Sequence, residues 1–142
     1  MARLLGASTP AVQGRRLEVA RETAATYGAI VVLKGAQTLV AAPDGRVSLN
    51  PTGNPALASG GSGDVLTGLL GGFLAQKPAA WDAARLGVYL HGLTADYFAA
   101  QYGPRSLVAG DLIELYPEVL GEFTRGSIPL SEEDICWQRV IS

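Results

Sequence analysis

Apolar residues recur at helical spacing in several stretches of the chain, separated by segments rich in glycine and proline. The first stretch begins at Ser8-Thr9-Pro10, a hydroxyl followed by proline, which is typical of a helix N-terminus. Its apolar stripe continues to Tyr27, and Gly28 fits the left-handed residue that follows a helix. The same periodicity predicts three further helices, over residues 64–76, over 78–101, and from about 110 onward. The last of these is expected to be interrupted at Pro117.

Two stretches predict β-structure. Residues 29–33, Ala-Ile-Val-Val-Leu, form an apolar run without polar alternation, which is typical of a strand covered by helices on both faces. Residues 39–42 and 46–49 flank Pro43-Asp44-Gly45, a strong signal for a hairpin. The order helix, strand, hairpin, glycine-rich loop, helices predicts an α/β fold, although with few strands for a domain of this length.

Composition indicates a folded protein and excludes several classes of site. Of the 142 residues, 48% are hydrophobic and 17% are charged, which excludes a disordered polar tail. The net charge of −2, without a basic block, argues against non-specific binding to nucleic acid. One cysteine and one histidine exclude an internal disulfide and a Cys- or His-rich metal site. Because no apolar run reaches the roughly 18 residues of a membrane span and no signal peptide is present, we expect a cytoplasmic protein.

Glycine is concentrated at one place in the chain. Seven of the 18 glycines lie between Gly53 and Gly72, although glycine inside an element is about 0.5–1 kcal/mol less favourable than alanine. Gly61-Ser62-Gly63 would expose successive N–H groups at a helix N-terminus, an arrangement that favours an anion. Two known phosphate motifs do not fit: no lysine follows Gly63, as a Walker A loop requires, and Leu66 stands where a dinucleotide fingerprint needs glycine.

Asp64 directly follows Gly61-Ser62-Gly63, the glycine cluster at the start of the predicted helix, and has two interpretations. An aspartate in the first turn of a helix gains about 0.3–1 kcal/mol from the helix dipole, so that capping alone can explain it. However, a carboxylate beside bound phosphates repels them. Its presence there therefore suggests a proton acceptor for a hydroxyl that attacks phosphorus, and we favour this second interpretation.

The residues around this cluster resemble a known family. Asn50-Pro51-Thr52-Gly53-Asn54-Pro55 and the segment 60–68, Gly-Gly-Ser-Gly-Asp-Val-Leu-Thr-Gly, resemble the signature of the ADP-dependent NAD(P)H-hydrate dehydratases of the ribokinase-like superfamily. Further similarity lies at residues 32–38, and at residues 87–92 with Asp96, and the agreement runs from about residue 1 to 121. Plain kinases of the superfamily usually carry Gly-Ala-Gly-Asp, so the Asn-Pro-Thr-Gly-Asn-Pro segment is what indicates the dehydratase.

The resemblance implies a ribokinase-like fold and a carbon–oxygen lyase that repairs hydrated nicotinamide cofactors. ADP or ATP would phosphorylate the C6 hydroxyl of the hydrated ring, and phosphate would then leave as the ring double bond reforms. With ADP the products would be NADH or NADPH, AMP and phosphate. Mg²⁺ is expected to bridge the nucleotide phosphates, although no dedicated carboxylate cage is readable in the sequence. The alternatives are a ribokinase-like small-molecule kinase and a catalytically silent nucleotide-binding module.

The resemblance also assigns roles to individual residues. Asp64 would take the hydroxyl proton and contact the substrate, and Gly61, Ser62 and Gly63 would hold the transferring phosphoryl group. The AMP portion of the nucleotide would be bound by Lys34, Gly35, Ala36, Gln37 and Thr38. Asn54 and His91 are substrate-binding candidates, but Asn54 can instead shape its loop and His91 can be a hydrogen-bonded core residue. We interpret Asp96 as a helix-surface residue, Asp111 as an N-cap residue, and the aromatic residues Trp81, Tyr89, Tyr97 and Phe98 as core.

The chain departs from the family at both ends. The N-terminal half of the family domain has no counterpart here, and a small sheet leaves residues 29–33 hard to cover. We therefore expect residues 1–124 to be the C-terminal portion of a dehydratase domain, an N-terminally truncated α/β fold. A homo-oligomer or a partner chain would then supply the missing half. Residues 125–142, with Cys136 and Trp137, form a tail without a family match.

Overall fold

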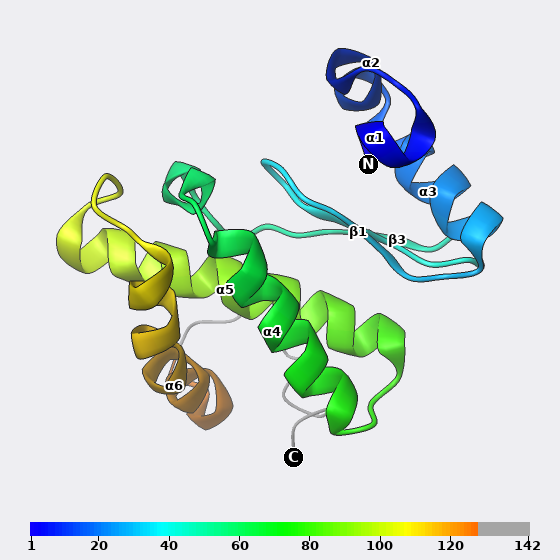
Figure 1. The fold of residues 1–142 in the computed structure, drawn as a ribbon. Coiled ribbons are helices and arrows are strands. Elements are labelled where there is room, and N and C mark those ends of the chain that lie inside the picture. Colours follow the sequence, from blue (N-terminus) through cyan, green and yellow to red (C-terminus); the bar gives the residue numbers. More distant parts are fainter. Residues whose placement is uncertain (128–142) are drawn as a thin grey trace. The chain divides into compact units, whose positions relative to one another are not determined.

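The computed structural model describes residues 1–127, which divide into two compact units, Met1–Pro51 and a C-terminal unit that begins at Thr52 (Figure 1). Residues 128–142, which include Cys136 and Trp137 of the expected tail, lie outside the described part. Among the helices of residues 1–127, none combines the length and the hydropathy that crossing a membrane requires.

The N-terminal unit packs helix α3 against a small antiparallel sheet. Its elements are α1 (Ala2–Leu5), α2 (Thr9–Gly14), α3 (Arg16–Tyr27), β1 (Val31–Leu33), β2 (Leu39–Ala41) and β3 (Val47–Leu49). The strands follow one another in the order β1-β2-β3, with Leu39 paired to Leu33 on one side and to Leu49 on the other. The core of this unit is made by Val12, Ala20, Ala24, Leu33, Leu39 and Ala41.

The predicted helix boundaries of this unit are confirmed at both ends but not in the middle. The Ser8 hydroxyl accepts from the Ala11 N–H at 3.3 Å, and Gly28 adopts the left-handed conformation with φ of 61°. A break at Arg15, with φ of −137° and ψ of 41°, separates α2 from α3. The single continuous helix was therefore wrong, and the end of its apolar stripe, Tyr27, is 55% exposed.

The strand at residues 29–33 is shorter than expected. Val31 and Val32 are half-buried and Ala29 is exposed, so that Leu33 is the buried residue of β1. The prediction of a strand covered on both faces is therefore not met in the described residues, where α3 packs on β1 and β2. The hairpin at Pro43-Asp44-Gly45 is confirmed, with β2 and β3 on either side of it.

The C-terminal unit is helical and is built around one long helix. Its elements are the short 3₁₀ helix η1 (Pro55–Ala58), α4 (Ser62–Ala75), α5 (Ala80–Tyr102) and α6 (Ala109–Arg125). Helix α5 packs against α4, α6 and η1. One buried cluster consists of Ala56, Ala95, Phe98, Leu107 and Leu112, and another of Leu86, Tyr89, Leu90 and Phe123.

Helix α6 runs without interruption through Pro117, so that the predicted break is wrong. Pro117 is exposed, whereas Leu112 and Val119 on either side of it are fully buried and hold both halves against the unit. Packing thus outweighs the hydrogen bond that proline removes. The N-cap residue is Val108, and not Asp111 as predicted. Asp111 lies in the first turn, where its carboxylate accepts from the Val108 N–H at 2.8 Å and so still caps the helix. Of the expected core aromatics, Tyr89 and Phe98 are buried, and Trp81 and Tyr97 are half-buried.

Candidate functional site

The glycine cluster opens helix α4 in the manner predicted. Gly61 has a φ of 84°, in the left-handed region, and its carbonyl accepts from the N–H groups of Asp64 and Val65 at 3.0 and 3.1 Å. A Cβ on Gly61 would lie 3.0 Å from the Cβ of Ala109. Both the backbone conformation and the close approach of α6 therefore require glycine here.

The front of α4 offers donors that the fold does not use. Among residues 1–127, the N–H groups of Gly61 and Gly63 have no hydrogen-bond acceptor. Ser62 is different, because its side chain is buried and its hydroxyl donates to the Leu57 carbonyl at 2.7 Å. The Ser62 N–H donates to the Ser59 carbonyl at 3.5 Å, and the Ser62 hydroxyl links η1 to α4. The unused donors of this helix end are therefore the N–H groups of Gly61 and Gly63. An anion at this helix end would meet amide donors and the positive end of the helix dipole.

Asp64 lies in the first turn of α4 and is exposed. Within the described residues its carboxylate forms no hydrogen bond and no ion pair, so that it does not cap the helix through a hydrogen bond. Both carboxylate oxygens are therefore available to a ligand beside the free amides of the glycine cluster.

The loop that precedes η1 is fastened to α5 by Asp96. The Asp96 carboxylate accepts from the Gly53 N–H at 2.7 Å and from the Asn54 side-chain amide at 2.9 Å. The other end of that amide, Asn54 Oδ1, accepts from the Ala56 N–H at 3.0 Å. The loop-shaping interpretation of Asn54 is confirmed. Asp96, which we interpreted as a surface residue, is half-buried and holds this loop in place.

Two further contacts join α5 to the loop before η1 and to the first residue of α4. The Thr52 hydroxyl donates to the Tyr89 carbonyl at 2.7 Å, and a Cβ on Gly92 would overlap the Thr52 backbone at 2.7 Å. His91 is 4% exposed, and its Nε2 lies 2.8 Å from the Ser62 carbonyl. Because a carbonyl can only accept, Nε2 carries the proton in this contact. The core interpretation of His91 is therefore supported, with the ring tied to the first residue of α4.

The predicted AMP-binding residues form the loop between β1 and β2 of the N-terminal unit. Lys34, Gly35, Ala36 and Gln37 are exposed, and Thr38 is half-buried. The loop is unusually bent, since Gln37 adopts a φ of 54° without being glycine. The Thr38 hydroxyl donates to the Gly35 carbonyl at 3.1 Å and closes the turn.

A pocket lies on the C-terminal unit between α5 and α6. The sequence did not predict it. Its volume is about 560 Å³, and it is lined by Phe98, Tyr102, Ser106, Asp111, Glu114 and Leu115. None of the predicted site residues lines it. Among residues 1–127, no three His, Cys, Asp or Glu side chains gather into a metal-binding group.

Comparison with known proteins decides the family. The family model of the NAD(P)H-hydrate dehydratases matches residues 1–118. The chain belongs to this family. The bifunctional NAD(P)H-hydrate repair enzyme of Moorella thermoacetica is 50% identical over 120 residues, which cover 84% of this chain and 23% of that protein. The ADP-dependent (S)-NAD(P)H-hydrate dehydratase of Bacillus subtilis is 41% identical over 121 residues, which cover 85% of this chain and 44% of that protein.

Solved structures of the family confirm the predicted ribokinase-like α/β fold. The Bacillus subtilis ADP/ATP-dependent NAD(P)H-hydrate dehydratase, co-crystallised with ATP/Mg²⁺, superposes with a TM-score of 0.82 at 40% identity, covering 85% of this chain and 44% of that one. A ribokinase-like superfamily protein of Enterococcus faecalis gives 0.65 at 32% identity, covering 78% and 38%. The chain thus spans less than half the length of these relatives. The family resemblance inferred from residues 50–68 is confirmed.

Proposed function

We propose that the chain acts in ADP-dependent dehydration of hydrated NADH or NADPH, as part of a nicotinamide-nucleotide repair lyase. The observation that carries the proposal is the pairing of an uncommitted carboxylate, Asp64, with the free amide donors of Gly61 and Gly63 at one helix end. Membership of the dehydratase family supplies the reaction. The related enzyme from Bacillus subtilis is named ADP-dependent.

In this proposal Asp64 accepts the proton of the C6 hydroxyl while that oxygen attacks the terminal phosphoryl group of ADP. A new O–P bond forms and the bond to AMP breaks. The unused amides of Gly61 and Gly63, with Ser62 between them, face the charge that develops on the phosphoryl oxygens. Phosphate then leaves with the C6–O electron pair, the ring nitrogen donates its own pair, and the ring double bond reforms as the adjacent carbon loses a proton.

The remaining assignments follow the same proposal. Lys34, Gly35, Ala36, Gln37 and Thr38 bind the AMP portion. Asn54 and His91 act on the substrate side through the loop and the α4 N-terminus that their side chains hold. Mg²⁺ would neutralise the nucleotide phosphates when bound, as the relative co-crystallised with ATP/Mg²⁺ suggests. One uncommitted carboxylate at this helix end, that of Asp64, fits an ion that is carried mainly by phosphates and water, because Mg²⁺ seldom uses an all-protein cage.

We further propose that residues 1–124 are the C-terminal portion of a dehydratase domain that acts in the cytoplasm. The match to residues 1–118 and the coverage of 44% of the Bacillus subtilis enzyme support this assignment.

Substitution of Asp64 tests the proposal. Asp64→Ala should abolish turnover while leaving the affinity for ADP·Mg²⁺ within about twofold, because the amides, and not the carboxylate, hold the nucleotide. Asp82→Ala is the matched control, since Asp82 is the acidic residue of the first turn of α5, as Asp64 is of α4. Turnover is followed as AMP release together with the return of the absorbance of the reduced nicotinamide, and affinity by calorimetry.

Each result separates the alternatives. Activity in the wild type and in Asp82→Ala but not in Asp64→Ala supports the assignment. Wild-type activity retained by Asp64→Ala refutes the role of the carboxylate. A stable phosphate ester as product indicates a kinase. ADP binding without any turnover by the wild-type chain indicates a nucleotide-binding module.

A further inference from the structure

One guanidinium holds three carbonyl groups at the loop between β1 and β2. Arg16, the first residue of α3, donates from Nη1 to the Ala36 carbonyl. Its Nη2 donates to the carbonyls of Leu33 at 3.2 Å and Gln37 at 3.3 Å. The approach is so close that a Cβ on Gly35 would lie 3.0 Å from Nη2.

These contacts fix the direction of the loop amides. In a trans peptide the carbonyl and the following N–H point in opposite directions, and the described chain has no cis peptide. When three carbonyls turn toward Arg16, the N–H groups of Lys34, Gln37 and Thr38 therefore point away from it. Among residues 1–127 these three N–H groups have no acceptor. The loop thus presents a set of unused donors on the face opposite the guanidinium.

The charge of Arg16 is not neutralised by the described residues. No carboxylate of residues 1–127 lies within 4.0 Å of its guanidinium, and its buried Nε has no acceptor. A cation at the first residue of a helix also opposes the helix dipole, which favours acidic groups there. Capping therefore does not explain this arginine. A positive charge on one side of the loop, with Lys34 and amide donors in the loop itself, favours an anion on the other side.

We propose that Arg16 is a positioning residue for the nucleotide, which holds the β1–β2 loop so that the amides of Lys34, Gln37 and Thr38 receive the phosphate of the AMP portion. The inference rests on the proposed function, and deepens it by assigning the AMP phosphate, rather than the base, to these amides. Arg16 does not touch the nucleotide. Its planar guanidinium donates to three carbonyls at once. A lysine ammonium on a flexible side chain cannot reproduce this geometry.

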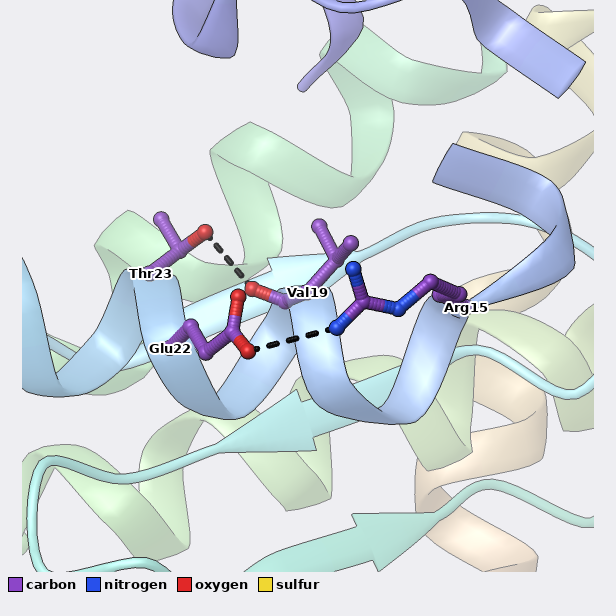
Figure 2. Close-up of polar contacts among 4 residues, drawn as sticks. All are labelled: Arg15, Val19, Glu22 and Thr23. Atoms are coloured by element: carbon purple, nitrogen blue, oxygen red, sulfur yellow. Dashed lines mark hydrogen bonds and ion pairs between the residues drawn. The ribbon is translucent and has the colours of Figure 1, made fainter. Parts of the chain in front are cut away.

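The test compares Arg16→Lys with Arg15→Lys in the full chain. Both substitutions keep the charge, but Arg15 is exposed and pairs on the surface with Glu22 at 3.5 Å (Figure 2). Figure 2 also shows the Thr23 hydroxyl on the Val19 carbonyl of the same helix, a contact that neither substitution touches. The dissociation constant for AMP is measured by calorimetry, the thermal midpoint by circular dichroism, and the loop amides by ¹H–¹⁵N NMR.

If the loop without Arg16 adopts its binding conformation about a tenth of the time, the apparent dissociation constant rises about tenfold. We expect this weakening for Arg16→Lys and less than twofold for Arg15→Lys. In the wild type, AMP but not adenosine should shift the amide signals of Lys34, Gln37 and Thr38, a readout that a merely structural role of Arg16 does not predict. Equal AMP affinity in both variants, or wild-type shifts that spare these amides, would overturn the inference while leaving the proposed function standing. Wild-type protein that binds neither AMP nor ADP would instead refute the proposed function.

Discussion

A side chain at Gly92 of α5 would collide with the loop that precedes η1. The residue is buried in α5, and a Cβ there would lie 2.7 Å from both the carbonyl carbon and the carbonyl oxygen of Thr52. Carbon atoms in contact normally lie about 3.5–4.0 Å apart. The obstacle is backbone that is itself held by the Thr52–Tyr89 hydrogen bond. Gly92→Ala must therefore displace the loop.

The expected effect is the balance of opposing terms. Alanine gains about 1 kcal/mol over glycine in a helix, but overpacking a tight site destabilises by about 1–3 kcal/mol. Loss of the Thr52–Tyr89 hydrogen bond removes about 1 kcal/mol more. Gly92→Ala should therefore destabilise the C-terminal unit by about 1–3 kcal/mol. Gly71→Ala is the matched control, because Gly71 is exposed in α4 with nothing within 4 Å of its Cβ position, and it should be stabilising by up to about 1 kcal/mol.

Urea unfolding followed by far-ultraviolet circular dichroism measures both variants. A change in midpoint at constant slope reports stability, whereas a changed slope reports altered compactness. The two glycine-to-alanine changes should move the midpoint in opposite directions. If Gly92→Ala is as stable as Gly71→Ala, the close approach of Thr52 to α5 is wrong, and with it the placement of the loop that precedes η1.

Two further predictions concern single carboxylates. Asp96→Ala leaves the Gly53 N–H without its acceptor, and should destabilise by about 1–3 kcal/mol and speed hydrogen exchange of that amide. Unchanged exchange would contradict the role of Asp96. The Arg46 side chain, through its hydrogen bond, lowers the pKa of the Asp44 carboxyl in the hairpin turn. Its stabilisation is therefore present above the unfolded pKa of about 4 and is lost as the pH falls through the lower folded value. Asp44→Asn should thus lower the thermal midpoint at pH 7 but not at pH 2, and an equal difference at both would refute this linkage.

Local signals in the sequence predicted the parts of the site that depend on one residue's own conformation. Gly28 adopts the predicted left-handed conformation after its helix, and Ser8 caps its helix as predicted. The start of α4 was predicted within two residues, because Gly61 at the N-cap meets a backbone requirement that is local.

Contacts between segments far apart in the chain could not be predicted in the same way. Arg16 lies 20 residues from Ala36, and Asp96 lies 43 residues from Gly53. The periodicity of the sequence places the side chains of Arg16 and Asp96 on the polar faces of their helices, and both faces do contain polar atoms. Periodicity does not show which backbone groups the fold brings into contact with these two side chains. The helix break predicted at Pro117 was wrong for the same reason. Its neighbours Leu112 and Val119 are held by tertiary packing, which no local rule includes.

The long-range contacts of the loop before η1 follow one geometric rule. Tyr89, Gly92 and Asp96 are spaced i, i+3, i+7 and so lie on one face of α5, over a rise of about 10 Å. Thr52 meets the first two of these residues, and Gly53 meets Gly92 and Asp96. An extended chain advances about 3.3–3.6 Å per residue, so that a few residues suffice to follow this face in the same direction as the helix. The loop therefore lies along a rigid helix. Glycine is favoured at position 53 because the backbone there has a φ of 104°, which L side chains rarely adopt, and because a Cβ would lie 3.0 Å from Leu57 Cδ1. Since His91 fastens Ser62 from the same helix, α5 sets the positions of both the loop and the amides beside Asp64, and substitutions on α5 should change the site without touching any ligand.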